Sequence, residues 1–263
     1  MTRIALRLEY AGTDYHGWQF QKNTSATIQG HLEQALGTIA NHPVKVTCAG
    51  RTDAGVHATH QIVNFDTVAS RPAKSWIFGT NAHLPDAISV RWSEIVDDEF
   101  DARFSATARR YCYYIRNSNI RSAISDQYLT KEHRPLDADV MHGAAQALIG
   151  EHDFSSFRAS HCQSLTPMRH VSAVTVIRRR DLVIIDITAN AFLHHMVRNI
   201  AGVLMDVGAG IKPENWVQEL LLLKDRNQGS ITARPNGLFL VNVDYPSRFG
   251  LPVTANLPFF DPR

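Results

Sequence analysis

The stretch AGRTDAGVHA, residues 49–58, contains a carboxylate that could do chemistry. Asp53 is followed by His57 and His60 in the spacing D-x-x-x-H-x-x-H, which would suit a transition metal if one helix face presented all three. Gly55 and the short polar run around it argue against a helix, so we expect no metal here and assign both histidines to the scaffold. Two interpretations of Asp53 stay open: a turn residue bound to its own backbone, or a catalytic carboxylate.

A second candidate is Arg198, in the segment HHMVRN at 194–199. On a helix it lies about 200° around the axis from both Met196 and Ile200, so it faces away from the apolar stripe. His194 would lie one turn earlier on the same side. The arginine is either solvated, which is common for such a position, or it faces a cleft and pairs with an acid.

Aromatic and basic residues adjoin in SATARRY, residues 105–111. Tyr111 begins a predicted strand directly after Arg109 and Arg110, and two more tyrosines follow in that strand. Such a group can stack an unpaired base and hold the neighbouring phosphates. Strand aromatics also serve as core residues, so this motif indicates nucleic acid only together with other evidence.

The composition suits a soluble globular protein and excludes several classes. Of the 27 basic residues only six are lysine, which leaves 21 arginines; a nucleic-acid partner or the base composition of the genome would each explain this. The three cysteines lie far apart, and no apolar run is long enough to cross a bilayer. We therefore expect a cytoplasmic protein without disulfides or membrane contact. No P-loop, G-x-G-x-x-G, G-x-S-x-G or kinase signature is present.

Hydrophobic periodicity predicts the elements that position these residues. Strands are expected at 3–10, 44–48, 61–65, 88–96, 111–116, 171–178, 182–189 and 237–245, and helices at 28–39, 73–83, 137–150, 192–207 and 214–224. The Asp53 loop then joins two strands. We predict an α+β protein of two similar halves, residues 1–105 and 106–263, each an antiparallel sheet flanked by helices, with the active cleft between them.

Five ordered motifs identify the chain as resembling the TruA-type tRNA pseudouridine synthases. They are GWQFQ at 17–21, AGRTDAGVHA at 49–58, FDARFSATARRYCYYI at 100–115, NAFLHHMVRNIAGVLMDVG at 190–208 and GLFLVNVDY at 237–245. One departure is Ala11 in EYAGTDY, where the family usually has an acid, and this affects a local loop contact. The resemblance implies the pseudouridine synthase fold and isomerisation of uridine to pseudouridine at positions 38–40 of the tRNA anticodon arm.

The resemblance also implies roles for single residues. Asp53 matches the catalytic nucleophile, Tyr111 the tyrosine that stacks on the target uracil, and Arg198 the arginine that pairs with the aspartate. Leu238 matches an apolar residue that packs against the base, and Arg51 an arginine that assists base flipping. Arg103 matches an RNA contact of the family. Arg109 and Arg110 are also expected to bind RNA, because they form the basic stretch next to Tyr111.

These roles agree with the physical requirements of the reaction. Extruding a nucleotide costs a few kcal/mol, which phosphate contacts and an aromatic surface offset. Desolvation disfavours an ionised carboxylate in a closed pocket, and a paired guanidinium restores the charged form by lowering its pKa. Either attack of Asp53 on C1′ or abstraction of the 2′ proton would serve, and neither route needs a cofactor or a metal. The resemblance further implies a homodimer. The rival hypotheses are a noncatalytic tRNA-binding or folding module and a metal enzyme.

Overall fold

The computed structural model describes residues 1–263 except 22–23, 25, 161 and 252–255, and the chain forms two compact units. Unit 1 comprises residues 1–107 and 239–261, and unit 2 comprises residues 108–238 and 262–263. The seam near residue 107 lies close to the predicted one. The predicted second half contains residues 106–263, whereas the structure has residues 239–261 in unit 1.

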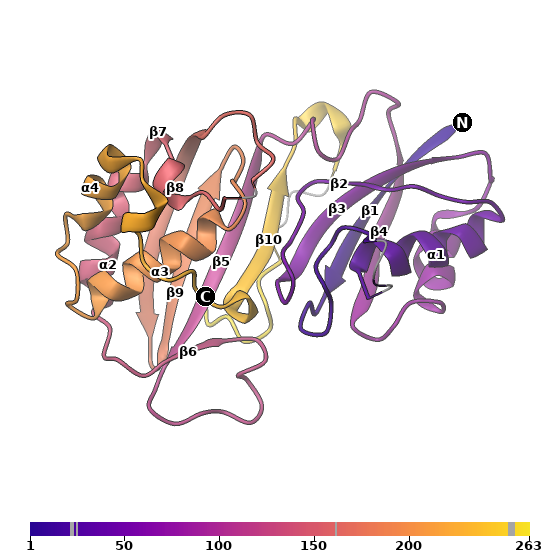
Figure 1. Ribbon diagram of the computed structural model, residues 1–263. Helices are drawn as coiled ribbons and strands as arrows, with labels where there is room; N and C mark the ends of the chain where they lie inside the picture. The colour runs from indigo at the N-terminus through magenta and orange to yellow at the C-terminus, as the bar shows by residue number, and fades with distance from the viewer. Residues whose placement is uncertain (22–23, 25, 161, 252–255) are drawn as a thin grey trace. The chain divides into compact units, whose positions relative to one another are not determined.

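Unit 1 is built on a mostly antiparallel sheet (Figure 1). Its strands are β1 (Thr2–Tyr10), β2 (Thr47–Cys48), β3 (His57–Thr67), β4 (Ile88–Val96) and β10 (Leu238–Asp244). β1 pairs antiparallel with both β3 and β4, and β2 pairs antiparallel with β3. β10 runs parallel to β3, joined at Phe239 opposite His57 and at Leu240 opposite Ala58.

One helix covers part of unit 1. Helix α1 (Ile28–Ala40) begins where the Thr27 hydroxyl accepts a hydrogen bond from the Gly30 amide, and it ends at Asn41, whose φ is 59°. Of its apolar residues at the predicted helical spacing, Ile28, Leu32, Ala35 and Leu36 are buried and Ile39 is half-buried. It packs on η1 (Ser75–Gly79), a π-helical segment, and η1 packs on β4.

Unit 2 combines strands with a layer of helices (Figure 1). Its strands are β5 (Ala108–Asn117), β6 (Thr130–Glu132), β7 (Gly150–Asp153), β8 (Met168–Arg179) and β9 (Leu182–Ala189), in the order β5-β9-β8-β7 with β6 parallel to β5. Its helices are α2 (Ala138–Ala145), α3 (Met196–Gly208) and α4 (Trp216–Leu223). Helix α2 packs on β8 and α3 on β5, and α2 contacts both other helices.

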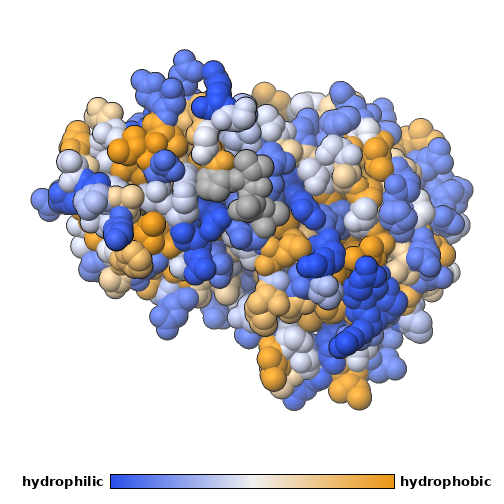
Figure 2. All heavy atoms as spheres, turned by 180° about the vertical axis from the view of Figure 1, so that it is seen from behind, coloured by the Kyte–Doolittle hydropathy of each residue, from blue (hydrophilic) through white to orange (hydrophobic). Residues whose placement is uncertain are grey.

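Short 3₁₀ turns connect these elements. They are η2 (Gln146–Leu148), η3 (Ser155–Phe157), η4 (Arg226–Gln228), η5 (Pro235–Gly237) and η6 (Ser247–Phe249). Figure 2 shows hydrophobic residues in several separate groups among hydrophilic ones on the face it presents. Over the residues that the structure describes, no helix has both the length and the apolar character to span a membrane.

The elements largely follow the sequence-based prediction, and the α+β class is confirmed. The strand expected at 44–48 is shorter, because only Thr47 and Cys48 pair with β3. The segment expected as a helix at 73–83 is centred on a π-helical turn. The helix expected from 192 begins only at Met196, after His195 with a φ of 61°. His194 therefore precedes the helix, and its expected place one turn before Arg198 on the helix was wrong.

Candidate active site

The loop that carries Asp53 is a fixed turn. The Trp18 amide donates to the Thr52 carbonyl over 3.0 Å, and the Val56 amide donates to the Asp53 carbonyl over 3.1 Å. Gly55 has a φ of 78°, a conformation that L side chains rarely adopt. These contacts hold the backbone on both sides of the carboxylate, which is half-buried.

The first motif, GWQFQ, is part of this support. Gly17 has a φ of 90°, and a Cβ there would lie 2.8 Å from the Thr52 carbonyl oxygen. Only glycine lets the two chain segments approach so closely. The Tyr10 hydroxyl lies 2.8 Å from the Thr52 hydroxyl, and Arg51 beside it is exposed. The loop thus presents Arg51 outward while its neighbour Thr52 is anchored.

Both histidines of the loop motif have structural contacts within unit 1. His57 is fully buried, its Nδ1 accepts the Gly12 amide over 3.0 Å, and its ring stacks on Phe239 with centroids 4.5 Å apart. His60 Nδ1 lies 3.3 Å from the side-chain amide of Asn256. These contacts support the scaffold role predicted for them.

Tyr111 lies on β5 in unit 2, where it is 7% exposed. Its ring meets the edge of Phe192 at 5.1 Å with an interplanar angle of 85°. Tyr113 and Tyr114 are fully buried core residues, and burial raises the pKa of Tyr113. The core alternative therefore applies to these two tyrosines, and Tyr111 remains the candidate for base stacking.

Arg109 and Arg110 bind protein groups. Arg109 is buried and donates to the Asn190 carbonyl over 2.9 Å. Arg110 forms a bidentate pair with Asp186, at 2.8 and 2.6 Å, and Arg263 binds the same carboxylate. These contacts give both arginines a structural role, and their predicted RNA contacts stay a prediction.

Asp186 is 8% exposed. Burial alone would raise its pKa, but the hydrogen bonds and the positive charges of Arg110 and Arg263 together lower the pKa below its ordinary value. The same pairing raises the pKa of Arg110. The result is a charged triad that ties β5 to β9 and to the C-terminal residue.

Arg198 lies in the first turn of α3 and is half-buried. Its Nε donates to the Ala233 carbonyl over 2.8 Å, and the Ala233 amide donates back to the Arg198 carbonyl over 3.1 Å. The guanidinium is thus oriented by the segment that follows η4. Gly202 permits this approach, because a Cβ there would lie 2.2 Å from the Ile231 carbonyl oxygen.

The sequence analysis did not predict a buried hydrogen-bond network around Asn199, the residue after Arg198. The Asn199 side chain donates to the Phe157 carbonyl over 2.8 Å and accepts from Thr232 over 2.6 Å and from Arg226 over 3.0 Å. Burial lowers the pKa of Arg226. The available signal was an asparagine inside a helix, which is unfavourable unless its side chain has buried partners.

Leu238, which ends the long segment of unit 2, is 5% exposed. It follows Gly237, where a Cβ would lie 2.5 Å from the Tyr114 carbonyl oxygen. The glycine of the G-L-x-L motif therefore lets the chain pass close to β5 before β10 begins. The structure places Arg51, Asp53 and Arg103 in unit 1 and the remaining predicted residues in unit 2.

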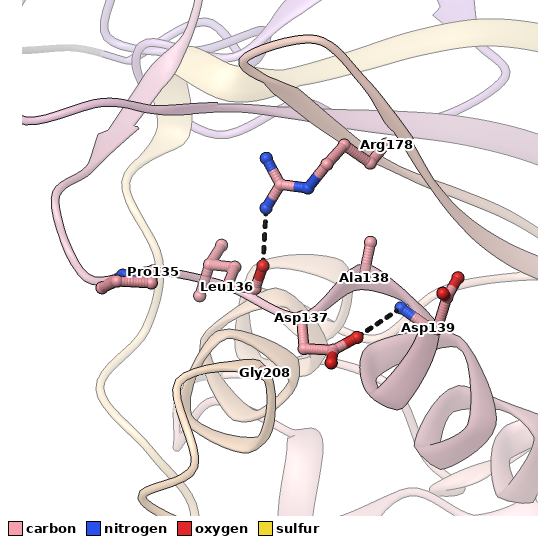
Figure 3. Close-up of a pocket in the computed structure, with 7 residues that line it drawn as sticks. All are labelled: Pro135, Leu136, Asp137, Ala138, Asp139, Arg178 and Gly208. Atoms are coloured by element: carbon pink, nitrogen blue, oxygen red, sulfur yellow. Dashed lines mark hydrogen bonds between the residues drawn. The ribbon is translucent and has the colours of Figure 1, made fainter.

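A surface depression of about 380 Å³ lies at the start of α2 (Figure 3). Arg178 lines it and donates to the Leu136 carbonyl over 2.6 Å. Asp137 caps the helix by accepting from the Asp139 and Val140 amides. These groups serve local structure, and the depression is lined by none of the predicted site residues.

The sequence matches known proteins over its length. A family model described as tRNA pseudouridine synthase matches residues 8–105 and 144–246. The chain is 57% identical to tRNA pseudouridine synthase A of Shewanella sp. (strain MR-4) over 258 residues, 98% of each chain. It is also 57% identical to tRNA pseudouridine synthase A of Idiomarina loihiensis over 250 residues, 95% of each chain. The chain belongs to the tRNA pseudouridine synthase family.

Membership of the tRNA pseudouridine synthase family confirms the resemblance drawn from the five motifs. The residues matched by the family model include Asp53, Arg198 and Leu238, whereas Tyr111 falls between the two matched ranges. A solved structure titled Crystal Structure of a Cbf5-Nop10-Gar1 Complex aligns with 90% of this chain and 57% of its own, at 10% identity and a TM-score of 0.35. That likeness is too weak to carry a conclusion.

Proposed function

We propose that this chain isomerises uridine to pseudouridine at positions 38, 39 and 40 in the anticodon arm of tRNA. The observation that carries the proposal is 57% identity, over 98% of both chains, to a tRNA pseudouridine synthase A. The fixed turn at Asp53 supports it, because a nucleophile must be held in place to react with one atom of an extruded nucleotide. On the same resemblance we propose that the protein is a cytoplasmic homodimer. Sedimentation velocity would measure the mass of the particle and so test the dimer.

The proposed chemistry needs one carboxylate and its partners. Asp53 attacks C1′, or removes the 2′ proton, and the N1–C1′ bond breaks. The uracil turns, and C5 bonds to C1′ as the Asp53–C1′ bond breaks or, on the second route, as the proton returns to C2′. The proton on C5 is then lost and N1 is protonated, which completes the isomerisation. Tyr111 is assigned to stacking and Arg198 to stabilising the charged carboxylate. Leu238 is assigned to apolar contact with the base, and Arg51 to displacing it from the stack.

Incubation with unmodified tRNA, followed by pseudouridine mapping at single-nucleotide resolution, tests activity and position together. Pseudouridine at positions 38–40 is the expected result. Tight binding without any pseudouridine would favour the noncatalytic tRNA-binding module. Activity that disappears in excess chelator and returns with added metal would favour the metal enzyme.

Replacement of Tyr111 separates stacking from hydroxyl chemistry. We expect Tyr111→Phe to bind the anticodon arm within a few-fold of wild type, and Tyr111→Ala to bind about tenfold more weakly, because a base–aromatic stack contributes about 1–3 kcal/mol. Filter binding of unmodified tRNA measures both. Equal losses in the two variants would assign the role to the hydroxyl instead.

Affinity for tRNA should fall as salt rises. If Arg51 and Arg103 each neutralise one phosphate, the dissociation constant should rise about tenfold between 50 and 200 mM salt, because each contact releases condensed counterions. Arg103→Ala should reduce the slope of log affinity against log salt by about one. Arg91→Ala, which removes an exposed arginine beside Glu9, is the matched control and should leave the slope unchanged. A salt-independent affinity would contradict the phosphate contacts.

A further inference from the structure

The turn at residues 101–105 of unit 1 has an unusually complete set of hydrogen bonds. The Asp101 carboxylate accepts from the amides of Arg103 and Phe104, each over 2.8 Å. The Ser105 amide donates to the Asp101 carbonyl over 2.9 Å, and the Ser105 hydroxyl accepts the Asp101 amide over 3.0 Å. Four contacts within five residues fix this backbone.

The turn is also anchored to the sheet of unit 1. Ala102 is fully buried, and its amide donates to the side-chain oxygen of Asn64 on β3 over 2.8 Å. Its carbonyl accepts the hydroxyl of Tyr245 over 2.6 Å. Because both main-chain groups of Ala102 are bound, the two residues that follow it are presented from a rigid base.

Those two residues are a cation and an exposed aromatic ring. Phe104 is 78% exposed, and the Arg103 guanidinium lies 5.0 Å from the centroid of its ring. A single exposed phenylalanine is ordinary on a protein surface. A phenylalanine on a turn that is rigid, anchored and paired with an exposed arginine offers a flat face and a positive charge together.

Two arginines supply positive charge near the turn. Arg51 and Arg103 both act on the buried thiol of Cys48: burial raises its pKa to about 12, and the two guanidiniums oppose that rise. Asn64, which binds the Ala102 amide, pairs with Thr47 of β2, so the turn lies beside the strand that leads to the Asp53 loop.

Four acids lie in or just before the turn. Asp101 binds two amides, and Glu99 pairs with Arg248 at 3.3 Å. Asp97 accepts the Glu99 amide over 2.8 Å, and Asp98 acts on Arg3.

We propose that Phe104 is a stacking surface for an unpaired base of the RNA substrate, with Arg103 holding the adjacent phosphate. The proposal rests on the proposed function and adds a recognition residue to it. Aromatic faces bind every base, and a neighbouring guanidinium contributes charge and further stacking. The turn lowers the entropy lost on binding, because the backbone that carries the ring is already held by hydrogen bonds.

The test compares Phe104→Ala and Phe104→Trp with Phe78→Ala, which removes a ring that is 68% exposed elsewhere in unit 1. The probes are an unmodified tRNA transcript, its isolated anticodon stem-loop, and a fully paired RNA duplex. Phe104→Ala should weaken binding of the first two RNAs about 5- to 150-fold, the range for one lost base stack. Phe104→Trp and Phe78→Ala should stay within threefold of wild type. Duplex affinity should be unchanged in all variants.

Each outcome decides the proposal. Phe104→Ala with wild-type affinity for the stem-loop overturns it, and so does an equal loss on the duplex, which would indicate backbone contact. An equal loss in Phe104→Trp would also overturn it, since tryptophan retains the stacking face. Wild-type protein that binds tRNA but forms no pseudouridine would end the proposed function. The Phe104 comparison would still stand in that case, because it is read from binding alone.

Discussion

Replacing Asp53 by alanine is expected to abolish uridine-to-pseudouridine conversion, with a fall of about 10⁴-fold or more in the single-turnover rate, while tRNA binding is retained. The side chain is assigned as the nucleophile, whereas the main-chain contacts of its turn run through carbonyls and amides that alanine keeps. Asp53→Asn, which nearly preserves volume, should lose the same activity. Both rates are measured with tRNA bound to saturating enzyme.

The control is Asp86→Ala, which removes one exposed negative charge from the same unit. It should turn over at the wild-type rate. Pseudouridine formed at a normal rate by purified Asp53→Ala would refute the assignment of the nucleophile. If tRNA binding disappeared together with turnover, the aspartate would instead be required for the shape of the RNA site.

The second large effect is on stability, at Asp186. Asp186→Asn should lower the free energy of unfolding at pH 7 by about 2–4 kcal/mol, because it leaves the partly buried Arg110 and Arg263 without the carboxylate that they share. Urea unfolding followed by circular dichroism measures the loss. Asp181→Asn is the matched control in the same hairpin: Asp181 is 55% exposed where it pairs with Arg116, so its loss should cost less than about 1 kcal/mol.

The contribution of Asp186 should depend on pH in a definite direction. Its pKa in the folded protein lies below the value of about 3.9 expected in the unfolded chain. Such a group stabilises the fold fully above the unfolded pKa, and the stabilisation is lost as pH falls through the folded pKa. The difference between wild type and Asp186→Asn should therefore be constant near neutrality and narrow below about pH 4. A difference that widened in acid would contradict the depressed pKa.

Local patterns predicted most of the fold because they report local forces. The alternation in β1 and the spacing of Ile28, Leu32 and Leu36 reflect one buried face, and the structure buries those residues. The loop at Asp53 was recognised from its glycine and its two flanking strands. The family followed from five motifs, each of which the structure places at an anchored turn, strand or helix start.

Features that depend on distant partners could not be predicted in this way. The motif around Arg110 gave no sign of Asp186, a residue 76 positions later that binds its guanidinium. The role of Asn199 depends on Thr232 and Arg226, which lie in a segment without periodicity. The helical spacing around Arg198 extended too far back, because the left-handed backbone at His195 ends the pattern before His194.

The strand β10 has a consequence for how this protein is made. Phe239 and Leu240 pair with His57 and Ala58, and Asn256 contacts His60, so the segment directly after the Asp53 loop is completed by residues near the end of the chain. During translation, residues 1–107 leave the ribosome long before these partners exist. A nascent chain can therefore complete the sheet of unit 1 only after β10 has been synthesised.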